Sequence, residues 1–293
     1  MIWLMFLQLA INGIVLGSVY AIIALGFSLI YGATRIFHFA HGGIYACSAY
    51  IAYIFLIPLN FPWWLSLPAA MFFTALLGVF LDWLVYEPLI DRNASPLVLM
   101  ISSLGLFIVL ENVLAVIFGS DPLVMRLGDV KQGIRLGTAY VTPSQIHIVL
   151  STALMSAILF FFFKKTRMGV SVRALASNPD LAESLGMDVK KIRYVTFAVG
   201  SALAAVASVL VCIDISTIDP VMGFNAILMA TFAIIVGGVG NIPAAAGGGF
   251  LLGIAQHFGI WKISSEWEMA ILFLILFIFI IFRPNGLFGK GKV

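Results

Sequence analysis

Apolar residues follow one another in long runs along nearly the whole chain, and short polar segments separate these runs. A transmembrane α-helix needs about 20 predominantly apolar residues. On this measure we place spans at about residues 3–31, 40–58, 63–86, 97–118, 145–163, 193–212, 223–239, 243–260 and 268–282. The pattern predicts an all-α, polytopic transmembrane helix bundle of about eight or nine helices.

The stretch "GGVGNIPAAAGGG" separates the eighth run from the seventh. Glycine and proline are tolerated at membrane depth where protein shields the backbone or where the backbone lines a cavity. The stretch therefore predicts either close packing of small residues between helices or a broken, re-entrant helix. In the second case Gly237, Gly238 and Gly240 are candidates for the lining of a translocation path.

The composition agrees with a membrane protein. Of the 293 residues, 62% are hydrophobic and 10% are charged, whereas a soluble domain carries about 25% charged residues. No basic segment precedes the first apolar run, so we expect no cleaved signal peptide. Cys47 and Cys212 lie in or beside apolar runs, which favours two buried thiols. We treat residues 1–293 as a single membrane domain.

Lysine and arginine are distributed unevenly between the loops. One side of the predicted bundle carries Arg35, Arg92, seven residues between Lys164 and Arg193, Arg283, Lys290 and Lys292. The other side carries Arg126, Lys131, Arg135 and Lys262. Because short cytoplasmic loops are rich in these residues, twelve against four predicts a cytoplasmic C-terminus and a cytoplasmic loop at 164–193. The N-terminus lies outside if nine spans hold, and inside if one pair of runs, such as 223–239 and 243–260, forms a single span. The long outer loop at 119–146 is then a candidate docking surface.

The cytoplasmic loop contains signals for a short helix. Asn178 is a good N-cap, Pro179 fits the first helical position, and Asp180 favours the positive end of the helix dipole. Gly186 is a typical residue for the left-handed turn that ends a helix.

A helix of about seven residues is marginal in water by itself. Leu181 and Leu185 lie one turn apart on the same face. Two interpretations remain open at this point: an ordinary positive-inside loop, or a helix that docks on a soluble subunit and transmits force from it.

Four stretches resemble the permeases of branched-chain amino acid ABC transporters. They are "RALASNPDLAESLGMDVKKIRYVTFAVGSALAAVASVL", "GFSLIYGATRIFHFAHGGIYACSAY", "SPLVLMISSLGLFIVLEN" and "FAIIVGGVGNIPAAAGGGFLLG", and the resemblance spans residues 10 to 288. The chain departs from the family pattern where His38 replaces an asparagine and Gly43 replaces an acidic residue. In the glycine-rich stretch, Asn241 and the run of alanines at 244–246 replace the more common serine and Gly-Ala-Leu.

The resemblance implies a set of partners in a bacterial or archaeal cytoplasmic membrane. They are a second, homologous permease chain, two cytoplasmic ATPase subunits, an extracytoplasmic amino-acid-binding protein and the lipid bilayer. The ATPase subunits would dock on the coupling loop, whose motif is matched by Arg173, Asn178, Asp180, Glu183 and Gly186. The chain has no G-x-x-x-x-G-K-[ST] motif, so we expect the partner subunits to use ATP. We expect this chain to bind no cofactor and no nucleic acid.

Several polar residues lie inside apolar runs. Glu111 is expected to lie inside the protein because a charge at bilayer depth is costly. Together with Asn112 and Asn225 it is a candidate for the translocation path. Asp82 is expected near the membrane interface, and so are His38 and His41, because no third ligand for a metal is near them.

Two other classes of protein remain as alternatives. A secondary transporter would carry ionisable residues in several helices and repeat symmetry, whereas this chain offers mainly Glu111. A membrane enzyme would need a nucleophile or metal motif, and none appears. Within the transporter class, urea and short amides are the alternative substrates to branched-chain amino acids.

Overall fold

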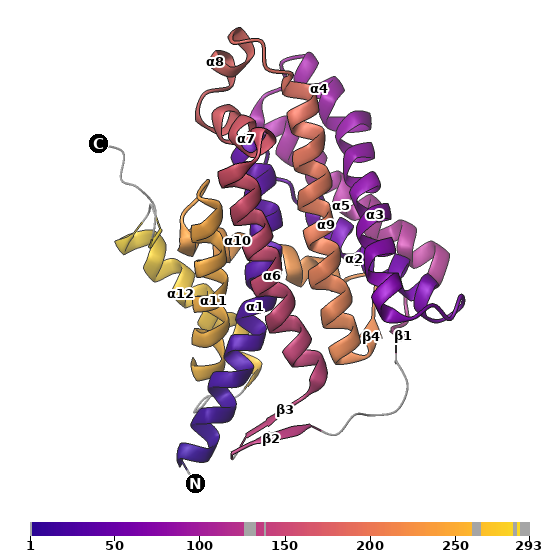
Figure 1. The fold of residues 1–293 in the computed structure, drawn as a ribbon, viewed down its shortest axis with the longest axis vertical. Helices are drawn as coiled ribbons and strands as arrows, with labels where there is room; N and C mark the ends of the chain where they lie inside the picture. Colours follow the sequence, from indigo (N-terminus) through magenta and orange to yellow (C-terminus); the bar gives the residue numbers. More distant parts are fainter. Residues whose placement is uncertain (1, 126–132, 138, 260–264, 284–285, 288–293) are drawn as a thin grey trace.

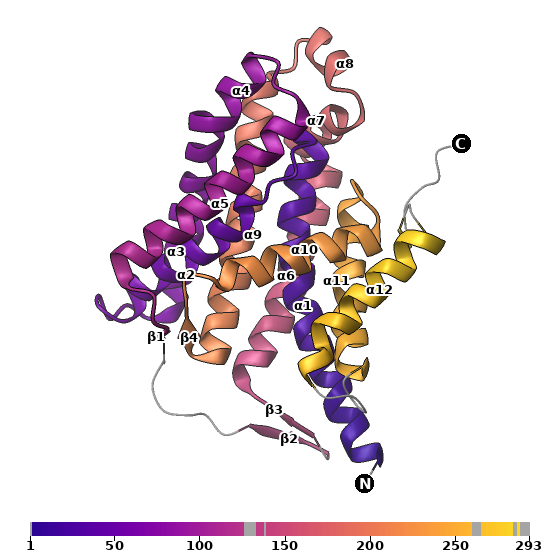
Figure 2. The same cartoon turned by 180° about the vertical axis from the view of Figure 1, so that it is seen from behind.

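Figures 1 and 2 show the computed structural model, which describes residues 2–125, 133–137, 139–259, 265–283 and 286–287. Most of each predicted apolar run lies in a helix. The α-helices are α1 (Ile2–Thr34), α2 (Ala40–Leu56), α3 (Trp63–Leu81), α4 (Glu87–Asp91), α5 (Pro96–Phe118), α6 (Pro143–Lys165), α7 (Arg167–Ser177), α8 (Pro179–Ser184), α9 (Val189–Ile215), α10 (Met222–Gly237), α11 (Ile242–Gly259) and α12 (Glu268–Phe282). A π-helical turn, η1 (Asp82–Tyr86), joins α3 to α4, and a 3-10 turn, η2 (Ser265–Trp267), precedes α12.

The prediction of an all-α polytopic protein is confirmed, but the count of eight or nine spans is not. Five stretches are long and apolar enough to cross a membrane: Phe6–Thr34, Trp63–Asp91, Pro96–Phe118, Pro143–Lys165 and Val189–Ile215. Helices α10 and α11 pass the same test only as a pair, and they are bent by 112° at their break. Helices α2 and α12 are apolar but shorter. Helix length therefore supports five spans among the described residues, or six with the bent pair.

Side-chain caps determine where several helices begin. The Ser95 hydroxyl accepts a hydrogen bond from the Val98 N–H at the start of α5. Thr142 and Gln145 form a reciprocal capping box at the start of α6, which satisfies two otherwise unpaired backbone donors. A proline follows each of these caps, at a position where its missing N–H is not needed. These caps fix the residues at which the loops end and the helices α5 and α6 begin.

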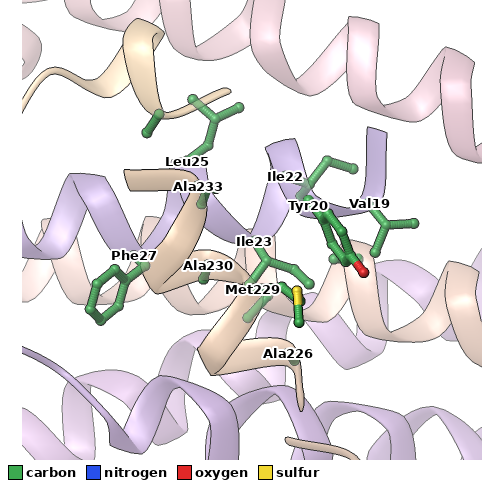
Figure 3. Close-up of a cluster of buried hydrophobic side chains, with 14 of the residues drawn as sticks. Val19, Tyr20, Ile22, Ile23, Leu25, Phe27, Ala226, Met229, Ala230 and Ala233 are labelled. Carbon is green, nitrogen blue, oxygen red and sulfur yellow. The ribbon is translucent and has the colours of Figure 1, made fainter. Parts of the chain in front are cut away.

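Helix α1 lies at the centre of the bundle. In the 18-residue apolar stretch of α1, 89% of the residues are buried. In the corresponding stretch of α6 only 17% are buried, so α6 is a peripheral helix. Figure 3 shows Ile23 of α1 beside Ala230 and Met229 of α10, and all three belong to one buried cluster. Small side chains on α10 let the two helices approach closely, as is common in membrane bundles.

Among the described elements, helices α1 and α11 make the most extensive contact with each other, and glycines make this contact possible. A Cβ atom on Gly253 would lie 2.2 Å from the backbone nitrogen of Gly17. A Cβ on Gly249 would lie 2.6 Å from the backbone nitrogen of Ala21. Any larger residue at either position would push the two backbones apart, so we call this contact the α1–α11 glycine seam.

The two ends of the bundle differ. Helices α4, α7 and α8 lie at one end, at the top of Figure 1. The N-terminus and four short strands lie at the other: β1 (Leu123–Val124), β2 (Ile134–Leu136), β3 (Ala139–Val141) and β4 (Thr217–Ile218). Strand β1 pairs with β4, and β2 pairs with β3, all antiparallel. Arg126, Lys131, Lys262, Lys290 and Lys292 of the charge count lie outside the described residues.

Candidate coupling segment and translocation face

Helix α7 continues from α6 after a single residue, and sequence reasoning missed it. The Thr166 hydroxyl caps it by accepting the Gly169 N–H at 3.0 Å. Val172 and Leu175 are buried in a cluster with Leu29 of α1. A threonine cap followed by apolar residues three apart is a recognisable helix signal, and it could have identified α7 from the sequence.

Helix α8 confirms the short helix predicted at 178–186. The Asn178 Oδ1 atom accepts the Leu181 N–H at 3.0 Å, and Pro179 is the first helical residue. Gly186 has φ +79°. Its N–H donates to the Glu183 carbonyl at 2.9 Å, and the Met187 N–H donates to the Ala182 carbonyl at 3.1 Å. These bonds satisfy carbonyls that would otherwise be unpaired at the end of the helix.

The side chains of α8 divide into anchored and exposed ones. Ala182 is buried in the same cluster as Leu175, so the helix is attached to the body of the protein. Leu181 is 55% exposed and Leu185 is 69% exposed. Glu183 is exposed as well. The side chain of Asp180 lies outside the described residues. Helix α8 is therefore fixed on one side and presents two leucines on the other.

A cluster of ion pairs lies directly after this segment. The Arg193 Nε atom donates to Asp82 Oδ2 at 2.8 Å, and both side chains are buried. Lys190 binds Glu87 at 2.7 Å and Asp91 at 3.1 Å. Asp82 begins the π-helical turn η1 and is fully buried within the protein, and its place near the membrane interface stays a prediction. Its carboxylate can be buried because α9 brings a guanidinium to it.

The two histidines are both fully buried within the protein, and their place near the membrane interface stays a prediction. The loop after α1 folds back into the bundle and carries His38 with it. The His38 Nδ1 atom lies 2.8 Å from the Tyr86 hydroxyl. The Ala40 N–H donates to the Ser103 hydroxyl of α5 at 3.0 Å. Polar partners on η1 and α5 thus stabilise the start of α2 within the bundle.

Three candidate path residues lie on neighbouring helices. Glu111 is partly exposed on α5, and no hydrogen bond or ion pair joins it to any described residue. Asn112 is exposed, and its amide donates to the Ile108 carbonyl of the same helix at 2.8 Å. Asn225 is exposed in the first turn of α10. Helices α5, α10 and α12 lie toward the viewer in Figure 2, and a contact between Phe107 and Phe224 joins the first two.

The three candidate glycines lie at the break between α10 and α11. A Cβ on Gly237 would lie 2.1 Å from the Ala244 carbonyl oxygen. Gly238 and Gly240 have φ +131° and +82°, which favour glycine. Close packing of small residues and a broken helix therefore occur together here. Gly240 and Arg173 line one cavity beside α7. A candidate residue of the translocation path and a candidate residue of the coupling loop therefore lie in the same region.

The comparisons with known proteins agree with this arrangement. Residues 9–280 match the family described as branched-chain amino acid transport system, permease component. The chain is 33% identical to the high-affinity branched-chain amino acid transport system permease protein BraD of Pseudomonas aeruginosa, over 98% of this chain and 97% of that one. It is 32% identical to the corresponding LivH protein of Escherichia coli K12, over 99% of this chain and 98% of that one.

One solved structure shares the fold. PsaBC from Streptococcus pneumoniae, determined in complex with a Fab, aligns with a TM-score of 0.53 and 14% identity, and covers 94% of this chain and 91% of that one. At this identity the similarity concerns the fold alone. The sequence matches extend from α1 to α12 and include the capped helix α8 and the glycine-rich break. This chain therefore belongs to the family of branched-chain amino acid transport system permeases.

Proposed function

We propose that this chain is the membrane-spanning permease of an ATP-driven importer and forms, with a second homologous permease chain, the translocation path for branched-chain amino acids. Family membership and near-full-length similarity to named permeases support the transport role. The observation that carries the mechanism is helix α8, which is anchored by Ala182 while Leu181 and Leu185 are exposed. Exposed leucines on a fixed helix suit an apolar groove in a partner.

In this proposal α7 and α8 form the coupling segment, and two cytoplasmic ATPase subunits bind such segments in the assembled transporter. Movement of the ATPase would reach the bundle through Arg193, because the ion pair with Asp82 joins the start of α9 to η1. Replacing Leu181 and Leu185 together by serine should abolish co-purification of the ATPase. The matched control is Ile134→Ser, a half-exposed apolar residue at the opposite end. Equal loss with the control would contradict the docking role.

The end of the bundle that carries α7 and α8 is proposed to face the cytoplasm, and the C-terminus is proposed to be cytoplasmic as well. Cysteine labelling can test this orientation, because Cys47 and Cys212 are buried and should give little background. An impermeant reagent added to intact cells should label Tyr140→Cys, on the exposed part of β3, but not Ser177→Cys. Permeabilisation should make Ser177→Cys reactive. The reverse pattern would overturn the orientation.

The face formed by α5, α10 and α12 is proposed to meet the second permease chain (Figure 2). It carries Glu111, Asn112 and Asn225, whose polar side chains are poorly suited to contact with acyl chains. Cross-linking between cysteines placed at Asn112 or Asn225 and the partner chain should join the two subunits. Cysteines on the peripheral helix α6, such as Leu154→Cys, should not form this link.

Uptake measurements distinguish the substrates and the energy source. An external binding protein is proposed to deliver leucine, isoleucine or valine, so labelled leucine should accumulate in cells that express the complete system. Urea and a short amide serve as the alternative substrates. Depleting ATP should stop uptake, and dissipating the ion gradients at constant ATP should not. Uptake that follows the ion gradient would contradict the ATP-driven mechanism.

A further inference from the structure

A large cavity lies between α1, α6, α7 and the break between α10 and α11. Its volume is about 1030 Å³, and it is only partly enclosed. Most of its wall is apolar and comes from residues such as Leu25, Leu159, Phe160, Phe163 and Ile242. Helices α6, α7 and α11 lie toward the viewer in Figure 1, on the side opposite to the face formed by α5, α10 and α12. The cavity therefore lies on another side of the bundle than the face that carries Glu111, Asn112 and Asn225, although the candidate path residue Gly240 is part of its lining.

The rim of the cavity is positively charged. Lys164 and Arg173 line it and are exposed, and none of its lining residues is acidic. The Lys164 ammonium lies 5.3 Å from the centre of the Phe160 ring. Arg35 is close by, because its guanidinium donates to the carbonyl of the lining residue Ala176 at 2.9 Å. Three cations without an acidic lining residue favour an anionic ligand.

The apolar part of the cavity extends into the membrane from this rim. Lys164 is the penultimate residue of α6, at the end of the candidate membrane span Pro143–Lys165. Ser156, eight positions earlier on α6, also lines the cavity and lies about 12 Å deeper at 1.5 Å per residue. Leu25 on α1 lies at a similar distance from the end of its helix. The cavity thus has cations at the membrane surface and an apolar wall at acyl-chain depth.

We propose that this cavity binds an anionic phospholipid, with its phosphate between Lys164 and Arg173 and one acyl chain along α1 and α6. Basic pockets between transmembrane helices bind anionic lipid headgroups in this manner. A free amino acid fits less well, because its ammonium group would meet cations and no carboxylate. The bound lipid would fill the space that separates the coupling helix α7 from the break at Gly240.

Native mass spectrometry of the full-length chain can test the proposal. The protein is incubated with phosphatidylglycerol or with phosphatidylcholine, and the retained lipid is counted. Replacing both Lys164 and Arg173 by alanine should lower the apparent affinity for phosphatidylglycerol about 25-fold, since each cation near the surface contributes about fivefold. Retention of phosphatidylcholine should remain low. Lys165→Ala, which removes a neighbouring exposed lysine that does not line the cavity, is the matched control.

A second variant tests the apolar part without changing the charge. Gly32 lines the cavity, and no atom lies within 4 Å of a Cβ placed on it. Gly32→Leu should fill the cavity and reduce retention of the lipid, while the helix itself gains propensity. The proposal is overturned by undiminished retention in both variants, by an equal loss in Lys165→Ala, or by displacement of the lipid with excess leucine.

Discussion

Two charged regions follow one another in the polar segment at 164–193, and the structure uses them in opposite ways. Helix α8 holds Glu183 and two leucines outside the bundle. Ten residues after Glu183, Arg193 is buried against Asp82. A count of positive charges by side treats both regions alike. In the proposed function, one end of the segment serves contact with another molecule, and the other end serves cohesion of the bundle.

The physical basis of this contrast is the cost of taking a charge out of water. An exposed ion pair contributes about 0–1 kcal/mol. A buried pair is different, because removing one partner leaves the other charge without compensation. Substitutions in the two regions should therefore affect different properties: the stability of the bundle in one case, and the binding of a partner in the other.

The largest effect is expected for Arg193→Met, which leaves the Asp82 carboxylate buried without its guanidinium. The free energy of unfolding should fall by about 3–5 kcal/mol. Denaturant unfolding of the purified chain in detergent measures this change. Lys191→Met, which alters an exposed neighbour, should change stability by no more than about 0.5 kcal/mol.

A double variant sharpens this test. Replacing Asp82 by leucine in the Arg193→Met background removes both charges, and buried ion pairs are often replaced by apolar residues without loss. Most of the lost stability should return. A double variant that is as unstable as Arg193→Met would show that the charges are not the cause.

A smaller and local effect is expected for Gly186→Val. The φ angle of +79° at this position strains a β-branched residue by about 1–3 kcal/mol. The end of α8 should be distorted while the membrane helices remain inserted. We expect normal expression, weaker co-purification of the ATPase and reduced uptake. Gly186→Asn is the control, since asparagine tolerates this conformation. Full uptake and full co-purification of Gly186→Val would reduce the segment to an ordinary positive-inside loop.

Asn178→Ala removes the N-cap of α8 without changing its exposed face. Loss of such a cap costs about 1 kcal/mol. Hydrogen exchange of the backbone amides at 181–187 should therefore accelerate about fivefold. Asn178→Asp should retain slow exchange, because aspartate also caps helices. Unchanged exchange in the alanine variant would mean that packing at Ala182, and not the cap, holds the helix.

The smallest effect is expected for Glu183→Ala. This carboxylate is exposed, so its removal should leave stability unchanged and weaken ATPase binding by less than about fivefold. Titration of the ATPase against the purified permease would measure the change. A loss as large as that of Gly186→Val would show that charge matters more than the shape of α8.

The elements that were predictable from the sequence depend on local signals. The apolar runs predicted the long helices, and the cap at Asn178 together with Gly186 predicted α8. The glycine-rich stretch predicted the break before α11. In each case neighbouring residues determine the structure, so a pattern along the chain is sufficient.

The elements that were missed depend on contacts between distant segments. Asp82 is buried because Arg193 reaches it from α9, more than one hundred residues later. His38 is buried because its loop folds back toward Tyr86. Neither contact has a signature in the local pattern. The number of spans was uncertain for a related reason, because α10 and α11 are bent by 112° and neither passes the span criterion alone.

The α1–α11 glycine seam has a consequence for the time course of biosynthesis. Gly17 is made well before its partner Gly253, which lies more than two hundred residues later in the chain. At about 5–20 residues per second, roughly ten to fifty seconds separate them. During this interval the central helix of the bundle is already in the membrane without its main neighbour. The glycine face of α1 must remain accessible until α11 has been made. The core around α1 is therefore complete only after α11 has packed against it.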